Sequence, residues 1–168
     1  KKRKNIMENN IIINRFDSFD EMKWKLGEKT IVFCEDEQDR YAIVNIKNSF
    51  EFGMAYNLYG IELMFGFDDK NDVCYIAAGQ NLISIDIKNK EILFNQKLFT
   101  VILDLFNIEN TIYILCDLEL ICYSDKKEKW GTAFREMVTD YELLENSRLW
   151  IDCEGRKIII NLKDGTVE

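Results

Sequence analysis

The chain has 168 residues, enough for one domain, and 47% of them are hydrophobic, which supplies a core of ordinary size. Asp and Glu number 30 against 22 Lys and Arg, so the formal net charge is −8, which argues against a general nucleic-acid binder. The chain has no His, and this excludes mechanisms that use imidazole as a base, a proton shuttle or a zinc ligand.

The N-terminus begins with four basic residues, but Asn14 and Arg15 soon interrupt the apolar run that follows. This pattern does not match a signal peptide, and no apolar run approaches the ~18 residues that span a bilayer. We interpret residues 1–9 as a basic and polar tail, whose first six residues are an expression remnant or upstream sequence. Residues 10–168 are then a single domain of a cytoplasmic protein that binds neither membranes nor nucleic acid.

The five cysteines are odd in number and form no C-x-x-C pair, so their spacing suggests neither a disulfide framework nor a zinc site. We expect reduced, mostly buried thiols, with no metal and no cofactor. The cysteines are Cys34, Cys74, Cys116, Cys122 and Cys153.

The chain repeats itself, because residues 73–89, 111–127 and 148–164 align with one another. Ala78, Cys116 and Cys153 share one position of the repeat, at steps of 38 and 37 residues. A fourth copy precedes these three in two parts, residues 30–35 and 41–48, which a longer polar loop separates.

Each repeat begins with a run rich in β-branched and aromatic residues, which is typical of a strand. A short polar break, a second strand, a tight turn and a third strand follow. One more apolar stretch precedes each later repeat, so the pattern predicts four short antiparallel strands per ~38 residues. These preceding stretches are residues 60–67, 100–106 and 137–144.

Residues 73–94, VCYIAAGQNLISIDIKNKEILF, run strand, Gly turn, strand ending in Asp, turn and strand. This pattern resembles a quinoprotein-type or WD-type β-propeller blade. The resemblance implies an all-β fold of four repeats of antiparallel strands, forming a small or incomplete β-propeller-like domain. An open curved β-sheet or sandwich is the alternative, and no quinone ligands can be matched.

Two N-terminal segments fit the repeat less well. Residues 10–16 form an expected strand that would pair into the last repeat and clasp the two chain ends together. Residues 18–26 are expected to form a short helix, because Ser18 and Glu21 make a capping box. The alternative is a strand at residues 21–26, which the blade pattern requires.

The polar breaks inside the four repeats fall on one face if the strands run up and down. Their acids outnumber their bases, Arg40 and Arg156, by seven to two. The opposite face carries many lysines, which neighbouring acids dilute. The repeat register therefore predicts one acidic face, made by residues 35–40, 79–81, 117–119 and 154–156.

We hypothesise that this face binds a basic protein partner and so occludes it. Small, acidic proteins without catalytic residues resemble the immunity proteins of bacterial toxin systems in these gross traits. That resemblance implies a partner such as a toxin nuclease domain. The expected partner-binding residues are Glu35, Asp36, Glu37, Asp39, Asp117, Glu119, Glu154, Tyr56 and Tyr59.

Two other functions remain open. The chain is a scaffold or sensor module of the propeller type, or it is a hydrolase or lyase that uses carboxylates from Asp36, Asp117 and Glu154. Four blades leave little axial room for a pocket, and small residues such as Cys116 and Cys153 would fill a central ring. We therefore expect no enzyme and assign no catalytic residue.

Overall fold

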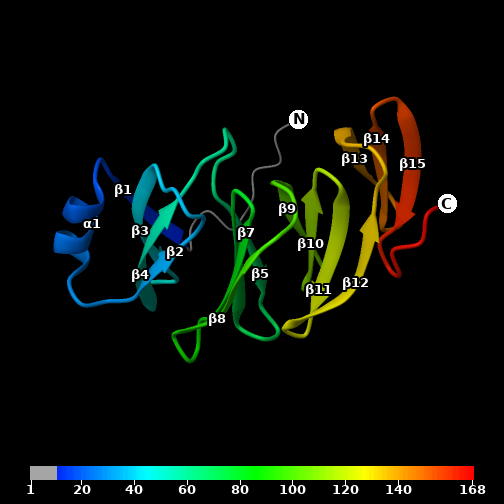
Figure 1. The fold of residues 1–168 in the computed structure, drawn as a ribbon. Helices are drawn as coiled ribbons and strands as arrows, with labels where there is room; N and C mark the ends of the chain where they lie inside the picture. The colour runs from blue at the N-terminus through cyan, green and yellow to red at the C-terminus, as the bar shows by residue number, and fades with distance from the viewer. Residues whose placement is uncertain (1–10) are drawn as a thin grey trace.

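The computed structural model describes residues 11–168, so the predicted tail at residues 1–9 lies outside the described part of the chain. Four small sheets, named A to D here, stack face to face in chain order, with helix α1 at one end and strand β15 at the other (Figure 1). The sheets form an open row, which is an incomplete β-propeller, and the predicted all-β fold is confirmed.

Sheets B, C and D are antiparallel meanders whose strands pair in chain order. The strands predicted to begin near positions 73, 111 and 148 begin there, as β6, β10 and β14. Sheet B holds β5 (Met64–Asp68), β6 (Val73–Ala78), β7 (Asn81–Asp86) and β8 (Glu91–Lys97). Sheet C holds β9 (Ile102–Ile108), β10 (Thr111–Cys116), β11 (Glu119–Ser124) and β12 (Lys127–Ala133). Sheet D holds β13 (Val138–Leu144), β14 (Arg148–Cys153) and β15 (Arg156–Asn161).

Sheet A departs from the repeat. Its strand order is β1-β3-β4-β2, and β2 runs parallel to β4. A strand does begin near position 30, but it lies at the sheet edge and does not form a hairpin with the next strand. The predicted clasp is wrong, because β1 pairs with β3 and not with the last sheet. The strands are β1 (Ile11–Phe16), β2 (Ile31–Phe33), β3 (Arg40–Ile46) and β4 (Phe50–Tyr56).

The helical alternative for residues 18–26 is confirmed and the strand alternative is wrong. Helix α1 spans Phe19–Leu26, and the Ser18 hydroxyl accepts the backbone N–H of Glu21 at 3.2 Å, as an N-cap does. The helix packs Met22 and Leu26 against Ile43 on sheet A. Sheet A is therefore covered by sheet B on one face and by the helix on the other.

The core forms three layers between neighbouring sheets, because alternate residues of a strand point to opposite faces. In β6, for example, Cys74 and Ile76 face sheet A, whereas Val73 and Tyr75 face sheet C. All five cysteines are buried and free, as predicted.

The shared repeat position of the cysteines does not form a ring. Cys34 and Ala78 lie in the layer between sheets A and B, while Cys116 and Cys153 lie one and two layers further along. The row of sheets is open, so no central axis brings these positions together.

Candidate functional site

One end of the strands gathers the loops that follow β2, β4, β6, β8, β10, β12 and β14, and we call it the loop face. Backbone hydrogen bonds connect these loops across the sheets. The N–H of Ile102 donates to Gly79, that of Asp117 to Val101, and that of Val138 to Asp117. The loop face comprises residues 34–39, 57–61, 79–80, 98–101, 117–118, 134–137 and 154–155. The four polar breaks singled out from the sequence therefore lie at one end of the stack.

Glu35 differs from its predicted role on this face. Its side chain is only 3% exposed, pairs with Lys97 at 2.8 Å and accepts the backbone N–H of Gln80 at 3.2 Å. The carboxylate therefore joins the first loop to sheet B. A partner protein cannot reach it without breaking this link.

The other acids expected at the site lie on or beside the loop face. Asp36, Glu37 and Glu154 are exposed, and Asp39 is exposed beside Arg40 at 3.3 Å. Asp117 and Glu119 are half-buried, and burial raises the pKa of both carboxyls, with Glu128 adding to the rise at Glu119. Among residues 11–168, five acids of this set form no ion pair: Asp36, Glu37, Asp117, Glu119 and Glu154.

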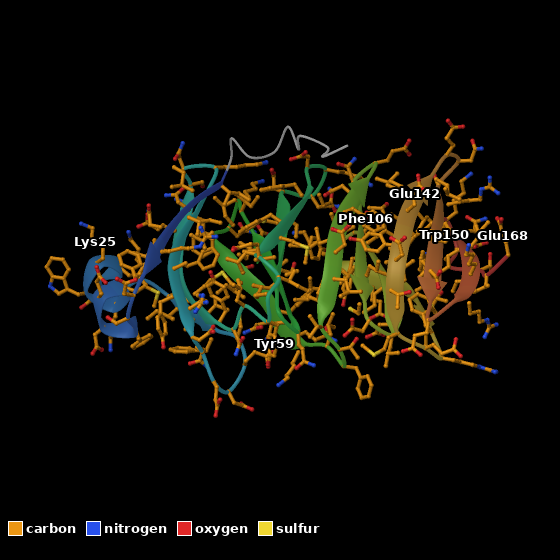
Figure 2. All side chains as sticks on the ribbon, turned by 90° about the horizontal axis from the view of Figure 1, so that it is seen from above. Lys25, Tyr59, Phe106, Glu142, Trp150 and Glu168 are labelled. Carbon is orange, nitrogen blue, oxygen red and sulfur yellow. The ribbon has the colours of Figure 1, made fainter. Side chains whose placement is uncertain are left out.

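The two tyrosines expected at the site have different environments. Tyr56 is 1% exposed and packs in the layer between sheets A and B, so its prediction as a partner contact is wrong. As the last residue of β4, it points into the stack. Tyr59 is 48% exposed and lies in the loop that follows β4, at the outer edge of the row of sheets (Figure 2). Its ring covers Gly79, where a Cβ atom would lie 2.7 Å from the ring.

Sequence reasoning missed three exposed apolar side chains on or beside this face. Phe99 is 82% exposed, Phe33 is 53% exposed and Met137 is 49% exposed. Phe99 and Met137 lie in the linkers between sheets, and Phe33 ends β2 just before the first loop. The sequence carries no clear signal for them, because each stands directly beside an apolar residue that is buried, namely Cys34, Leu98 or Val138.

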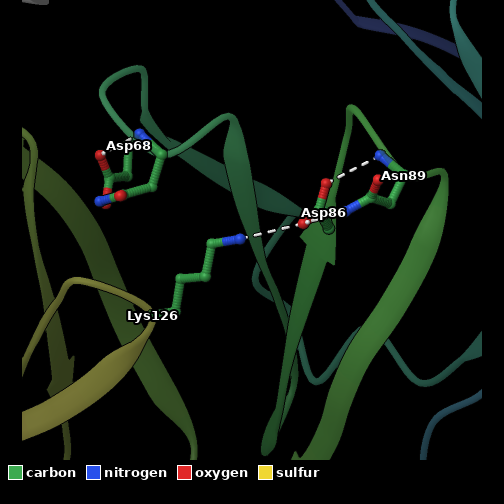
Figure 3. A network of polar contacts seen from close by, with 5 residues as sticks. Asp68, Asp86, Asn89 and Lys126 are labelled. Carbon is green, nitrogen blue, oxygen red and sulfur yellow. Dashed lines mark hydrogen bonds and ion pairs between the residues drawn. The ribbon is translucent and has the colours of Figure 1, made fainter.

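At the opposite end of the strands, which we call the turn face, three lysines pair with acids of a neighbouring sheet: Lys47, Lys70 and Lys126. The turn face comprises the turns at residues 47–49, 69–72, 87–90, 109–110, 125–126, 145–147 and 162–165. Lys47 pairs with Asp69 at 3.1 Å, and Lys126 pairs with Asp86 at 3.0 Å (Figure 3). Asp86 also accepts the backbone and side-chain N–H groups of Asn89. Two of the lysines expected on this face, Lys47 and Lys126, therefore tie neighbouring sheets together.

A pocket of about 130 Å³ opens between sheets C and D, and none of the carboxylates considered for catalysis lines it. Asp36, Asp117 and Glu154 instead lie over sheets A, C and D respectively. Within the described part of the chain, no three Cys, Asp or Glu side chains gather closely enough to hold a metal ion. No helix of residues 11–168 has the length and apolar character that a membrane crossing requires.

No protein-family model matches the chain, and no curated protein is significantly similar to it. Solved structures do share its fold. Sqt1 of Saccharomyces cerevisiae matches 78% of this chain at 14% identity with a TM-score of 0.53. The dihydro-heme d1 dehydrogenase NirN matches 76% at 10% identity, also with a TM-score of 0.53.

The β-propeller domain of Cps50 (Swd1) from Myceliophteria thermophila has a TM-score of 0.47, at 14% identity over 62% of this chain. The chain spans only 36%, 42% and 32% of the Swd1, Sqt1 and NirN chains. The resemblance to immunity proteins gains no support from these comparisons. At these identities the likeness concerns the fold alone, and what the comparisons establish is that this chain is an incomplete β-propeller.

Proposed function

We propose that this protein is an interaction module that docks a partner protein on its loop face. The observation that carries the proposal is Phe99, an aromatic side chain 82% exposed, in the linker whose Val101 carbonyl accepts the backbone N–H of Asp117, an acid without an ion-pair partner in the described chain. Large exposed aromatic residues are rare on a surface that faces only water, and they are frequent anchors of protein interfaces.

The charge of this face supports a basic partner. Asp36 and Glu37 project from the loop that follows β2 in sheet A. Asp117 and Glu119 lie between β10 and β11 and at the start of β11, in sheet C. Uncompensated carboxylates accelerate the approach of a basic surface, whereas buried apolar contacts hold the complex together. Phe33, Tyr59, Phe99 and Met137 would supply the apolar contacts.

The narrower hypothesis, that the partner is a toxin domain, stays a prediction from the gross traits of the sequence. The hypothesis of a carboxylate-based hydrolase or lyase loses its main support, because Asp36, Asp117 and Glu154 extend from different sheets and line no common pocket. A scaffold role needs only the loop face and is the function that the geometry favours.

The proposal is tested by two aromatic variants matched in exposure. Phe99 on the loop face and Trp24 on helix α1 are both 82% exposed. Tagged wild-type protein, Phe99→Ala and Trp24→Ala are each used to purify partners from cells that naturally make the protein. The recovered protein is then purified and titrated against all three.

We expect a stoichiometric partner to bind wild type and Trp24→Ala equally, and Phe99→Ala at least about tenfold more weakly. Both variants should keep the wild-type melting temperature, because neither side chain is buried. A partner that binds Phe99→Ala as tightly as wild type contradicts the proposal, as does a partner lost only with Trp24→Ala.

A further inference from the structure

Each of the three linkers between the sheets carries one exposed large apolar side chain. The linkers are residues 57–63, 98–101 and 134–137. Tyr59 is 48% exposed in the first, Phe99 is 82% exposed in the second and Met137 is 49% exposed in the third. Every other exposed large apolar side chain of residues 11–168 lies outside the linkers. The structure thus places one exposed apolar residue at the same point of each repeat, and we call these three residues the anchor row.

Contacts on the loop face connect the first anchor to the second. The Tyr59 ring covers Gly79, whose carbonyl accepts the backbone N–H of Ile102, just after the second linker, at 2.9 Å. The side-chain amide of Gln80 donates to the carbonyl of Phe99 at 3.2 Å. The short loop at residues 79–80 therefore lies between the first two anchors, and it has no charged side chain.

A second set of contacts connects the second anchor to the third. The Asp117 backbone N–H donates to Val101, two residues after Phe99, at 3.2 Å. The Asp117 carbonyl accepts the N–H of Val138, which directly follows Met137, at 2.9 Å. The half-buried carboxylate of Asp117 forms no ion pair with any residue from 11 to 168. Asp117 thus places an uncompensated negative charge between the second and third anchors.

The spacing of the anchor row follows from the stacking of the sheets (Figure 1). Sheets that stack face to face lie about 10 Å apart. Each linker spans one step of the stack, so consecutive anchors lie roughly 10 Å apart along the row. A partner segment that contacts all three anchors must present apolar side chains at this interval on one side.

Three regular backbones can be compared with this interval. One side of a β-strand presents every second residue, at multiples of about 6.6 Å, which does not match. A polyproline II segment presents every third residue, at about 9.3 Å, but the residues between them point away, so none faces Asp117. An α-helix presents residues seven positions apart at about 10.5 Å, and a residue three or four positions on lies midway on the same side. The alternation of anchor, carboxylate and anchor therefore fits an α-helix.

We propose that the anchor row binds an amphipathic α-helix of the partner protein. Apolar side chains at seven-residue intervals contact Tyr59, Phe99 and Met137, and a basic side chain between the last two pairs with Asp117. A neutral polar side chain faces the loop at residues 79–80. The inference rests on the loop-face proposal and specifies the form of the partner that this face binds.

The test uses a fluorescein-labelled, Ala-rich helical peptide, the heptad peptide, with three Leu residues at seven-residue intervals and Lys midway between successive Leu residues. A control peptide of the same composition has the middle Leu moved two positions along, to the opposite side of the helix. A second control is Pro-rich, with Leu at every third position and the same number of Lys residues. Fluorescence anisotropy measures binding to wild type, Phe99→Ala, Met137→Ala and Trp24→Ala, the last of which changes an equally exposed aromatic residue on helix α1.

We expect the heptad peptide to bind wild type and Trp24→Ala saturably and equally. Binding should weaken at least about tenfold with Phe99→Ala, with Met137→Ala and with either control peptide. Absence of saturable binding of the heptad peptide to wild type overturns the proposal. Equal or tighter binding of either control peptide overturns it as well.

Asp117→Asn tests the charge separately. It should weaken binding of the heptad peptide at least about threefold at low salt, and leave binding of a version with Gln in place of Lys unchanged. Equal losses for the two peptides would contradict the pairing of Asp117 with a basic side chain.

The co-purified partner distinguishes failure of this inference from failure of the loop-face proposal. If that partner needs Phe99 but the heptad peptide does not bind wild type, the helical form is overturned and the loop-face proposal stands. If the partner binds Phe99→Ala as tightly as wild type, the loop-face proposal itself fails.

Discussion

At the scale of single residues, Asp86 shows how the turn face is held together. It is 3% exposed, and the backbone N–H of Asn89, followed by Lys126, lowers the pKa of its carboxyl. A lowered folded-state pKa means that the ionised form stabilises the fold. This stabilisation is complete at neutral pH and is lost as the pH falls below about 4 and through the folded pKa.

We therefore expect Asp86→Asn to lower the free energy of unfolding by about 1–2 kcal/mol at pH 7, and by less near pH 3. Urea denaturation at both pH values measures the difference. Asp69→Asn is the matched control, because Asp69 is exposed and its ion pair with Lys47 contributes at most about 0.5 kcal/mol. An equal loss for Asp86→Asn at both pH values would contradict the role given to its charge.

The buried thiols are a second feature at this scale. Burial raises the pKa of all five, that of Cys34 to about 12 and that of Cys122 to about 11. The reactive thiolate is therefore scarce at pH 8, and we expect a thiol reagent to modify the folded protein far more slowly than the urea-unfolded protein. Rapid modification of all five in the folded state would show that the core is misassigned.

Cys116 should matter through packing alone. It is 0% exposed in the layer between sheets B and C. Cys116→Ser places a hydroxyl in this apolar layer, and we expect it to cost on the order of 1–3 kcal/mol of unfolding free energy. Cys116→Ala, which adds no polar group, should cost less in the same urea titration. The reverse order would contradict this explanation.

At the scale of elements, the approach of β5 to β9 sets the fit between sheets B and C. A Cβ atom on Gly66 in β5 would collide with Leu105 of β9 and would lie 3.2 Å from Ile112. Gly131 in β12 has its nearest neighbour at 3.6 Å. We expect Gly66→Ala to cost about 1–3 kcal/mol of unfolding free energy and Gly131→Ala to stay within ~0.5 kcal/mol of wild type. Equal effects in urea titrations would mean that β5 and β9 are not closely packed.

The elements that sequence could predict are those with local causes. The hairpins of sheets B to D join neighbouring strands by tight turns, and turns such as Glu109-Asn110 and Asp125-Lys126 have positive φ at both residues. This is the type I′ geometry that matches strand twist, and it leaves a readable pattern. The capping box at Ser18 is equally local.

Sheet A was less predictable because its pairing is not local. The parallel contact of β2 with β4 spans the whole of β3, and nothing in the three residues of β2 specifies it. The same limit applies to the site. Tyr56 was expected at the surface, but the packing of sheet A against sheet B buries it. This packing is not visible in the local sequence. Glu35 was also expected at the surface, but its carboxylate pairs with Lys97 of sheet B and is buried by this contact between sheets.

At the scale of the whole molecule, the two ends of the stack differ. Helix α1 covers the outer face of sheet A, whereas sheet D presents Trp150 at the other end (Figure 2). Between them the loop face and the turn face run along the full row of sheets. On the turn face three ion pairs join lysines to acids of a neighbouring sheet, and on the loop face one such pair joins Lys97 to Glu35.

The central claim is that the loop face captures a basic partner, and the association rate tests it most directly. Asp36→Lys/Glu37→Lys reverses two acids on the loop face, and Glu109→Lys/Glu145→Lys reverses two exposed acids on the turn face. Stopped-flow mixing with the co-purified partner measures both variants from about 20 mM to about 500 mM salt. Each reversed charge should alter the unfolding free energy by no more than ~0.5 kcal/mol.

The account predicts that the loop-face variant associates at least about tenfold more slowly than wild type at low salt, and that the two rates converge at high salt. The turn-face variant should remain within about twofold of wild type throughout. Equal association rates for the two variants at low salt would contradict the account, because they would show that the acids of the loop face play no part in recognising the partner.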